Sequence, residues 1–159
     1  MDNWEAETLN ISGIVDDSIV DGPGLRYTIF VQGCPHGCPE CHNPQTHSFE
    51  ENKRVTLGQL MSEIKENPLL YGVTFSGGEP FCQPGPLAIL GQQIKKAGMH
   101  LMCYSGYTYE QLLKRAETEP DVAALLDVVD VLVDGPFLIG ERDLELLYRG
   151  SRNQRLIDL

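Results

Sequence analysis

The stretch that decides the fold reads Leu25-Arg-Tyr-Thr-Ile-Phe-Val-Gln32 and runs, through Gly33, into the loop Cys34-Pro-His-Gly-Cys38-Pro-Glu-Cys41. Apolar side chains at alternate positions of residues 25–32 predict a β-strand with one buried face. The cysteine loop starts where this strand ends, and α/β proteins place their ligand sites at the carboxyl ends of strands. We therefore expect a functional site directly after this strand.

Helix and strand patterns alternate downstream of the cysteine loop. Capping boxes, each with a glutamine three residues later, start helices at Thr56 and Thr108, and Pro86 suits the first turn of a helix between them. Short apolar runs predict strands over residues 71–75, 100–104 and 129–133. We expect the chain to pass from a break at Glu119-Pro120 straight into the last of these strands.

This alternation predicts an α/β fold, because parallel strands need crossover connections and helices supply them. A closed eight-unit barrel typically takes ~250 residues, whereas this chain has 159. The sequence therefore predicts an open, curved sheet of about four to six mostly parallel strands covered by helices.

The length fits a single domain over residues 1–159. Within it we expect residues 1–20 to form an N-terminal extension and residues 141–159 to form a C-terminal segment suited to contact a partner. The first residues have neither the basic start nor the apolar run of a secretory signal, and no apolar stretch reaches the ~20 residues of a membrane helix. We therefore expect a cytoplasmic protein with no membrane partner.

The chain is acidic, with 12 Lys and Arg against 23 Asp and Glu and a net charge of −11. Such a chain repels phosphate backbones, so nucleic acid is not an expected partner. Four arginines gather near the C-terminus, at Arg142, Arg149, Arg152 and Arg155. A solvated face is the favoured interpretation of this cluster, and a small basic docking surface is the alternative.

Three of the five cysteines fall within eight residues, a spacing that indicates a metal site in a reducing compartment rather than a disulfide framework. Thiolates are the ligands that iron-sulfur clusters require. Because no fourth cysteine follows nearby, a 4Fe-4S cluster on Cys34, Cys38 and Cys41 would keep one iron open for chemistry. The alternative is a closed zinc site of these thiolates with His36 or His42.

The two other cysteines stand apart from this loop. Cys103 lies within a predicted strand, where we expect a small buried apolar side chain rather than a ligand. Cys82 stands three residues after Glu79, near the expected site, and no ligand role is predicted for it.

The segment from Gly22 through the three clustered cysteines to Asn43 closely resembles the signature of the radical S-adenosylmethionine enzymes that activate glycyl-radical proteins. The resemblance implies a partial, open βα barrel with a catalytic 4Fe-4S cluster on Cys34, Cys38 and Cys41. It also implies that the open iron binds the amino and carboxylate groups of the methionine part of S-adenosylmethionine. The residues that fall where this family lines the cofactor are Glu40, Cys41 and His42.

The turn Ser76-Gly-Gly-Glu-Pro80 follows the strand predicted over residues 71–75. Glycines let a backbone approach a ligand closely, although such a turn taken alone is more often an ordinary one. It is similar to the Gly-Gly-Glu motif of the same family, which holds the methionine amino group. The resemblance therefore implies that Gly77, Gly78 and Glu79 bind the cofactor.

Ser105 and Asp134 also follow predicted strands. Because the carboxyl ends of parallel strands meet at one rim of a sheet, we expect both residues beside the glycine-rich turn and consider them candidate cofactor contacts. The alternative is that they only form turns.

Two later segments, Val133-Asp-Gly-Pro-Phe137 and Arg149-Gly-Ser-Arg-Asn-Gln-Arg155, resemble the branch of this family that activates anaerobic ribonucleoside-triphosphate reductase. This resemblance implies reductive cleavage of S-adenosylmethionine and removal of a hydrogen atom from a glycine of the large reductase subunit. A low-potential electron donor such as flavodoxin would then be a second partner. The alternatives are another small radical S-adenosylmethionine enzyme acting on a small molecule, for example a deazaguanine synthase, and a non-catalytic zinc or electron-transfer module.

Overall fold

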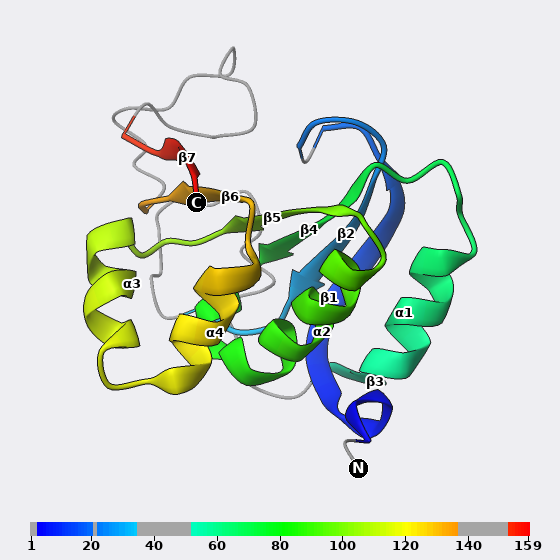
Figure 1. Cartoon of the computed structure of the whole chain (residues 1–159), viewed down its shortest axis with the longest axis horizontal. Helices are drawn as coiled ribbons and strands as arrows, with labels where there is room; N and C mark the ends of the chain where they lie inside the picture. The colour runs from blue at the N-terminus through cyan, green and yellow to red at the C-terminus, as the bar shows by residue number, and fades with distance from the viewer. Residues whose placement is uncertain (1–2, 21, 35–51, 137–152) are drawn as a thin grey trace.

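The structure, a computed structural model, describes residues 3–20, 22–34, 52–136 and 153–159. Their strands are β1 (Thr8–Ser18), β2 (Arg26–Val31), β3 (Lys53–Thr56), β4 (Gly72–Gly77), β5 (His100–Tyr104), β6 (Val131–Asp134) and β7 (Arg155–Asp158). Their α-helices are α1 (Leu57–Lys65), α2 (Pro84–Lys96), α3 (Tyr109–Ala116) and α4 (Pro120–Val128). Two short 3-10 turns, η1 (Trp4–Ala6) and η3 (Pro80–Cys82), complete the described elements (Figure 1).

The strands form one mixed sheet in the order β3-β1-β2-β4-β5-β6-β7. Strands β2, β4, β5 and β6 are parallel neighbours, as the strand and helix alternation predicts. The expectation of about four to six mostly parallel strands is wrong, because the described residues alone form seven strands and β1, β3 and β7 all pair antiparallel. Antiparallel neighbours can be joined by a short connection and need no helix between them. The alternation of strand and helix patterns in the sequence therefore did not predict β1, β3 and β7.

Strand β1 lies within residues 1–20, the segment expected to be an extension, and it pairs with both β2 and β3. Its register against β2 shifts twice, between Ile11 and Gly13 and between Val15 and Ser18. Such irregularities interrupt the period of two by which a strand is recognised in a sequence.

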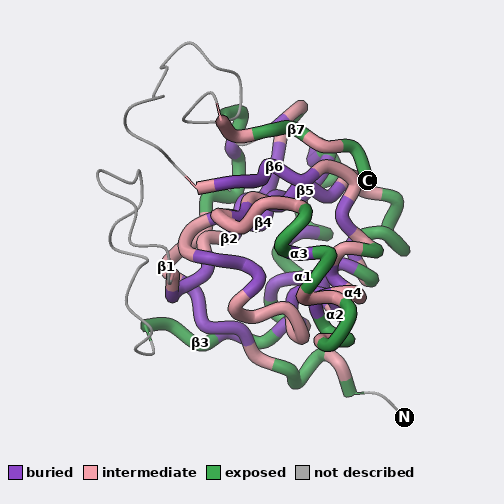
Figure 2. Tube along the Cα trace, turned by 90° about the vertical axis from the view of Figure 1, so that its left-hand side faces the viewer, coloured by how far each residue is buried: buried purple, intermediate pink, exposed green. Residues whose placement is uncertain are grey.

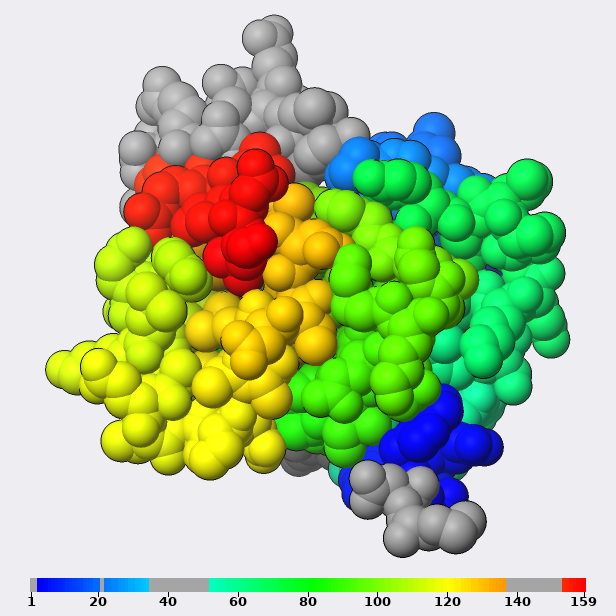
Figure 3. Space-filling view, in the orientation of Figure 1, coloured from blue at the N-terminus to red at the C-terminus, as the bar shows by residue number. Residues whose placement is uncertain are grey.

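The expectation that the chain passes from a break at Glu119-Pro120 straight into a strand is wrong, because helix α4 begins at Pro120. Pro120 is the first residue of this helix, because proline lacks a backbone N–H that the first turn would leave unpaired and its φ angle suits a helix. The predicted strand over residues 129–133 therefore begins later, as β6, after a further helical segment. Figure 3 shows α4 packed against α2 on the surface of the molecule.

The helices gather on one side of the sheet (Figure 2). The threonine caps predicted for α1 and α3 are confirmed: Gln59 N–H donates to Thr56 Oγ1 at 3.2 Å, and Thr108 and Gln111 form a complete capping box. The apolar faces of the helices and the strands share one core that includes Leu57, Phe75, Leu90 and Leu125. Among the described residues, no helix is long and apolar enough to cross a membrane.

The close approach of β4 to β2 depends on Gly77, at the end of β4. Its φ is +95°, and an added Cβ would lie 2.5 Å from Val31 N and 2.7 Å from Phe30 Cα, both backbone atoms. We expect Gly77→Ala to lower the free energy of unfolding by roughly 3 kcal/mol, since it adds left-handed strain to a backbone clash. Gly13→Ala is the matched control, because nothing lies within 4 Å of its added Cβ. Urea unfolding of both variants checks this, and equal midpoints would contradict it.

Candidate active site

The carboxyl ends of the four parallel strands form one rim of the sheet. Cys34 follows β2, Glu79 follows β4, Ser105 follows β5, and Asp134 ends β6. The sequence thus predicted correctly that these four residues share a rim. Cys34 is half-buried.

The glycine-rich turn after β4 is held against the end of β2 by two backbone hydrogen bonds. Gly78 N–H donates to Val31 O at 2.9 Å, and Glu79 N–H donates to Gly33 O at 2.7 Å. Because Gly33 directly precedes Cys34, these bonds keep Glu79 beside the start of the cysteine loop.

The Glu79 carboxylate joins the ends of β4 and β5. Glu79 is 0% exposed; its Oε2 accepts from Phe81 N–H at 3.0 Å and from Ser105 Oγ at 2.9 Å, and its Oε1 accepts from Gly106 N–H at 2.7 Å. Ser105 Oγ also accepts from Tyr107 N–H at 3.0 Å. Ser105 therefore orients Glu79, and the carboxylate has a defined direction at the rim.

Asp134 has structural partners of its own. Its side chain, in a residue that is 1% exposed, accepts from Tyr109 N–H at 2.7 Å at the start of α3 and from Arg155 Nε at 3.0 Å on β7. Arg155 also pairs with Glu110 at 2.7 Å, and Figure 3 shows β7, in red, lying against α3. The Asp134 carboxylate thus anchors α3 and β7 to the rim, and its contact with a cofactor stays a prediction.

Four predicted site residues lie outside the described residues, namely Cys38, Glu40, Cys41 and His42. Among the residues that are described, no three His, Cys, Asp or Glu side chains gather closely enough to hold a metal. Cys34 fits an iron-sulfur cluster in its chemistry, since a thiol at a strand end offers a soft ligand. The other two thiolates would come from Cys38 and Cys41.

The first part of the sequence signature lies at the far end of β2 from the cysteine loop. Arg26 is fully buried there and donates to Pro23 O at 2.7 Å, Thr74 Oγ1 at 2.7 Å and Val73 O at 2.9 Å. These bonds tie the Gly-Pro-Gly turn to β4. This half of the signature therefore supports the sheet and does not reach the rim.

Three further residues near the rim were not predicted to act there. Burial, followed by the charge of Glu79, raises the pKa of the Cys82 thiol to about 11. The pKa of the Tyr107 hydroxyl is also raised, by burial and then by the charges of Cys82 and Glu79. Arg115 lies over the Tyr107 ring at 5.0 Å, and its four-residue spacing from Glu119 is the one sequence signal that could have identified it.

Cys103, by contrast, is a buried core residue, as predicted. It is 0% exposed on β5, and burial raises its thiol pKa well above the usual value.

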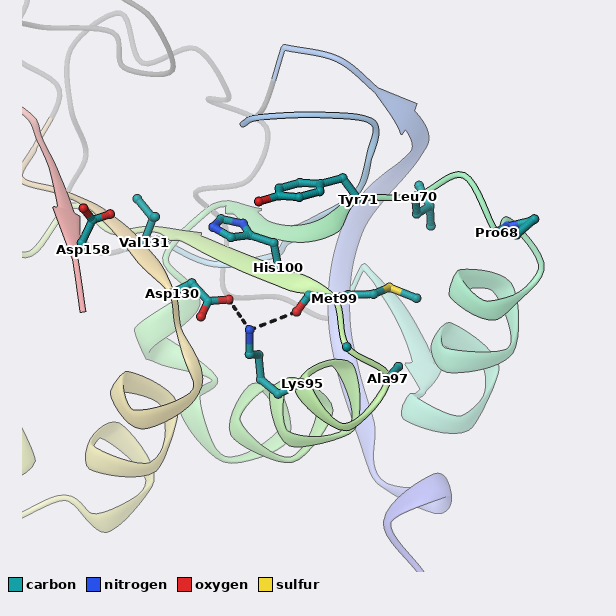
Figure 4. A pocket seen from close by; sticks show the side chains of 11 residues that line it. Pro68, Leu70, Tyr71, Lys95, Ala97, Met99, His100, Asp130, Val131 and Asp158 are labelled. Carbon is teal, nitrogen blue, oxygen red and sulfur yellow. Dashed lines mark hydrogen bonds and ion pairs between the residues drawn. The ribbon is translucent and has the colours of Figure 1, made fainter.

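A hollow at the opposite end of the sheet is lined by charged and aromatic side chains (Figure 4). Two of its charged groups satisfy each other: Lys95 forms an ion pair with Asp130 and donates to Met99 O at 3.0 Å, and Asp130 accepts from Leu101 N–H at 2.8 Å. These two side chains therefore offer a ligand little uncompensated charge.

The aromatic side chains that line this hollow also contact other protein groups. The Tyr71 and His100 rings stack at 5.3 Å, and Arg26 Nη2 lies 2.9 Å from His100 Nδ1. Since a guanidinium can only donate, Nδ1 accepts and carries no proton. Burial, followed by the charge of Arg26, accordingly lowers the pKa of His100.

Comparison with known proteins shows the family of the chain. Residues 20–157 match the family model described as a 4Fe-4S single cluster domain, which favours an iron-sulfur cluster over zinc. The chain is 34% identical over 145 residues to an anaerobic ribonucleoside-triphosphate reductase-activating protein of Vibrio cholerae, covering 86% of this chain and 89% of that protein. The corresponding protein of Escherichia coli K12 is 33% identical over 144 residues, covering 86% and 90%.

Two other similarities are more partial. A pyruvate formate-lyase-activating enzyme of Clostridium pasteurianum is 35% identical over 134 residues, covering 79% of this chain and 54% of that protein. The crystal structure of QueE from Escherichia coli shares the fold, with a TM-score of 0.53 at 19% identity over 66% of this chain and 55% of that one. The chain therefore belongs to the 4Fe-4S single-cluster family and, within it, to the radical S-adenosylmethionine enzymes that activate glycyl-radical proteins.

Proposed function

We propose that this protein activates an anaerobic ribonucleoside-triphosphate reductase by reductive cleavage of S-adenosylmethionine at a 4Fe-4S cluster and removal of a hydrogen atom from a reductase glycine. The observation that carries the proposal is the rim itself, where Glu79 has a buried, oriented carboxylate and donates its backbone N–H to the carbonyl oxygen of Gly33, the residue before Cys34. The reductase-activating relatives, 33–34% identical over 86% of the chain, support this choice of substrate.

The cluster would be held by Cys34, Cys38 and Cys41, with one iron left open for S-adenosylmethionine. When bound and reduced, it supplies the electron that breaks a carbon–sulfur bond of the cofactor, which in turn supplies the radical that removes the hydrogen atom. The protein has to orient the cofactor and keep water and other hydrogen donors away from it.

We assign the orientation of the cofactor to the glycine-rich turn and the cysteine loop. Glu79 would accept from the methionine amino group, with Ser105 holding its carboxylate in place. Gly77 and Gly78 let the turn lie against β2, and Asp134 acts through its bonds to α3 and β7. Glu40, Cys41 and His42 complete the lining in this proposal.

The open sheet supports a protein loop as the substrate. Among the described strands the sheet ends at two different edges, β3 and β7, as expected for a partial barrel with lateral access. A small-molecule enzyme gains more from a closed site. In this proposal residues 141–159 contact the reductase, a low-potential protein such as flavodoxin donates the electron, and the clustered cysteines require the reducing cytoplasm.

The test uses a reductase that carries α-deuterated glycine. Reduced, reconstituted protein is mixed with S-adenosylmethionine and this reductase without oxygen, and the 5′-deoxyadenosine mass and the electron paramagnetic resonance spectrum are recorded. Deuterium in the nucleoside and a glycyl radical on the reductase should appear together. A reductase with alanine at its radical position is the control and should give neither. Cofactor cleavage without a reductase radical, coupled instead to turnover of a purine-like small molecule, would overturn the proposal.

A further inference from the structure

We propose that Arg115, on α3, is a positioning residue that holds the Glu79 turn in the geometry that binds S-adenosylmethionine. This inference rests on the proposed function for the identity of the ligand. The contacts that support it belong to the protein alone.

The first contact is with the turn that carries Glu79. Arg115 Nη2 donates to Phe81 O at 3.0 Å, while Phe81 N–H donates to Glu79 Oε2 at 3.0 Å. Both backbone polar groups of Phe81 are therefore hydrogen-bonded: its carbonyl oxygen accepts from the Arg115 guanidinium on α3, and its N–H donates to the Glu79 carboxylate. Its side chain is 0% exposed in the core, so the turn is anchored at this position.

The second contact is with the turn after β5. The Arg115 guanidinium lies 5.0 Å from the centre of the Tyr107 ring, a distance typical of a cation–π interaction. Tyr107 follows Gly106, whose N–H donates to Glu79 Oε1. Arg115 thus contacts the same two turns that the Glu79 carboxylate joins, from the side of α3.

The arginine itself is fixed in place. Its Nε and Nη2 both lie 2.8 Å from the Glu119 carboxylate, whereas its Nη1 is buried and has no hydrogen-bond partner among the described residues. Burial of an unpaired guanidinium nitrogen is costly, and the adjacent aromatic ring offers partial compensation. A planar fork can contact Glu119, Phe81 and Tyr107 together, whereas the single ammonium of a lysine cannot.

The experiment compares Arg115→Gln, Arg115→Lys and a control, Lys95→Gln. Lys95 forms the ion pair with Asp130 at the opposite end of the sheet, and Asp130 accepts from Leu101 N–H. Two quantities are measured: the dissociation constant for S-adenosylmethionine of the reconstituted protein, and amide hydrogen exchange by NMR at Phe81, Gly106 and Leu101 in the cluster-free protein.

Both Arg115 variants should bind S-adenosylmethionine about tenfold more weakly and exchange the Phe81 and Gly106 amides about tenfold faster, since the turn loses its charged hydrogen bond from Arg115 to Phe81 O. Cluster content, the Leu101 amide and the cleavage rate at saturating cofactor should stay within about twofold of the wild type. Lys95→Gln should accelerate exchange at Leu101 only. Full rescue by Arg115→Lys would show that charge alone suffices and overturn the positioning role.

Failure of this inference is distinct from failure of the proposed function. A wild-type protein that binds no S-adenosylmethionine would overturn the proposed function, while the exchange data would still decide whether Arg115 holds the turn. Wild-type cofactor binding together with unchanged affinity and unchanged exchange in Arg115→Gln would overturn the inference alone.

Discussion

Replacement of Cys34, Cys38 or Cys41 by alanine is expected to abolish the iron-sulfur cluster in each single variant. Three thiolates already leave one iron of a 4Fe-4S cluster open, and two cannot hold it. Iron and acid-labile sulfide are measured after anaerobic reconstitution, with the wild type expected to bind about four of each per chain. Each of the three variants should bind almost none.

Cys103 and Cys82 supply two controls, one far from solvent in the core and one closer to the site. Cys103 is buried on β5, so Cys103→Ala tests only the loss of a core thiol. Cys82 is half-buried, and the charge of Glu79 at the rim contributes to the raised pKa of its thiol. Cys82→Ala therefore tests whether a thiol near the site is needed to bind the cluster. Both should keep the full cluster. A fully loaded Cys38→Ala protein would contradict the assignment, and bound zinc in place of iron would restore the zinc alternative.

Loss of the Glu79 carboxylate is expected to have the second largest effect. In Glu79→Gln the shape is kept, but an NH₂ group faces either Gly106 N–H or the pair formed by Phe81 N–H and Ser105 Oγ. We expect a loss of about 2–3 kcal/mol in the free energy of unfolding, because hydrogen bonds to a buried charge are replaced by a donor facing a donor. Loss of the negative charge should also weaken S-adenosylmethionine binding about 100-fold.

Ser105→Ala is the matched control for Glu79. It removes one donor to the carboxylate but leaves its charge and its bonds to Phe81 and Gly106 intact. We expect Ser105→Ala to lower the free energy of unfolding by about 1 kcal/mol and to weaken cofactor binding much less than Glu79→Gln does. Urea unfolding of the cluster-free protein and calorimetry with the reconstituted protein measure the two effects. Equal cofactor affinities in Glu79→Gln and the wild type would remove Glu79 from the binding site.

Strong local patterns in the sequence determined the centre of the fold. The run over residues 100–104 is strand β5 with the same bounds, and Thr56 and Thr108 cap the first turns of helices α1 and α3 as expected, with the complete capping box formed at Thr108. Each of these signals spans only a few residues, so local geometry alone decides the element that it predicts. The four parallel strands follow from them, and so does the common rim, because every crossover returns the chain in the same direction.

The outer strands were decided only by tertiary pairing. β3 and β7 have four residues each, too few to show a period, and β1 is interrupted by register shifts. Each becomes a strand because a neighbour offers it hydrogen-bond partners. Helix α4 was missed for another reason: Glu119-Pro120 suits a break and a helix start equally well, and packing against α2 favours the helix.

The site divides in the same way. Residue identities in the sequence determined that Cys34 and Glu79 stand after neighbouring strands, because each motif directly follows its strand. Only the tertiary structure decided which groups these side chains contact: Glu79 meets Ser105 across 26 residues of sequence, and Arg155 reaches Asp134 across 21. A local pattern specifies an element and the residues directly after it, whereas contacts between distant residues depend on which elements become neighbours in the sheet and on the hydrogen bonds that burial then requires of their polar groups.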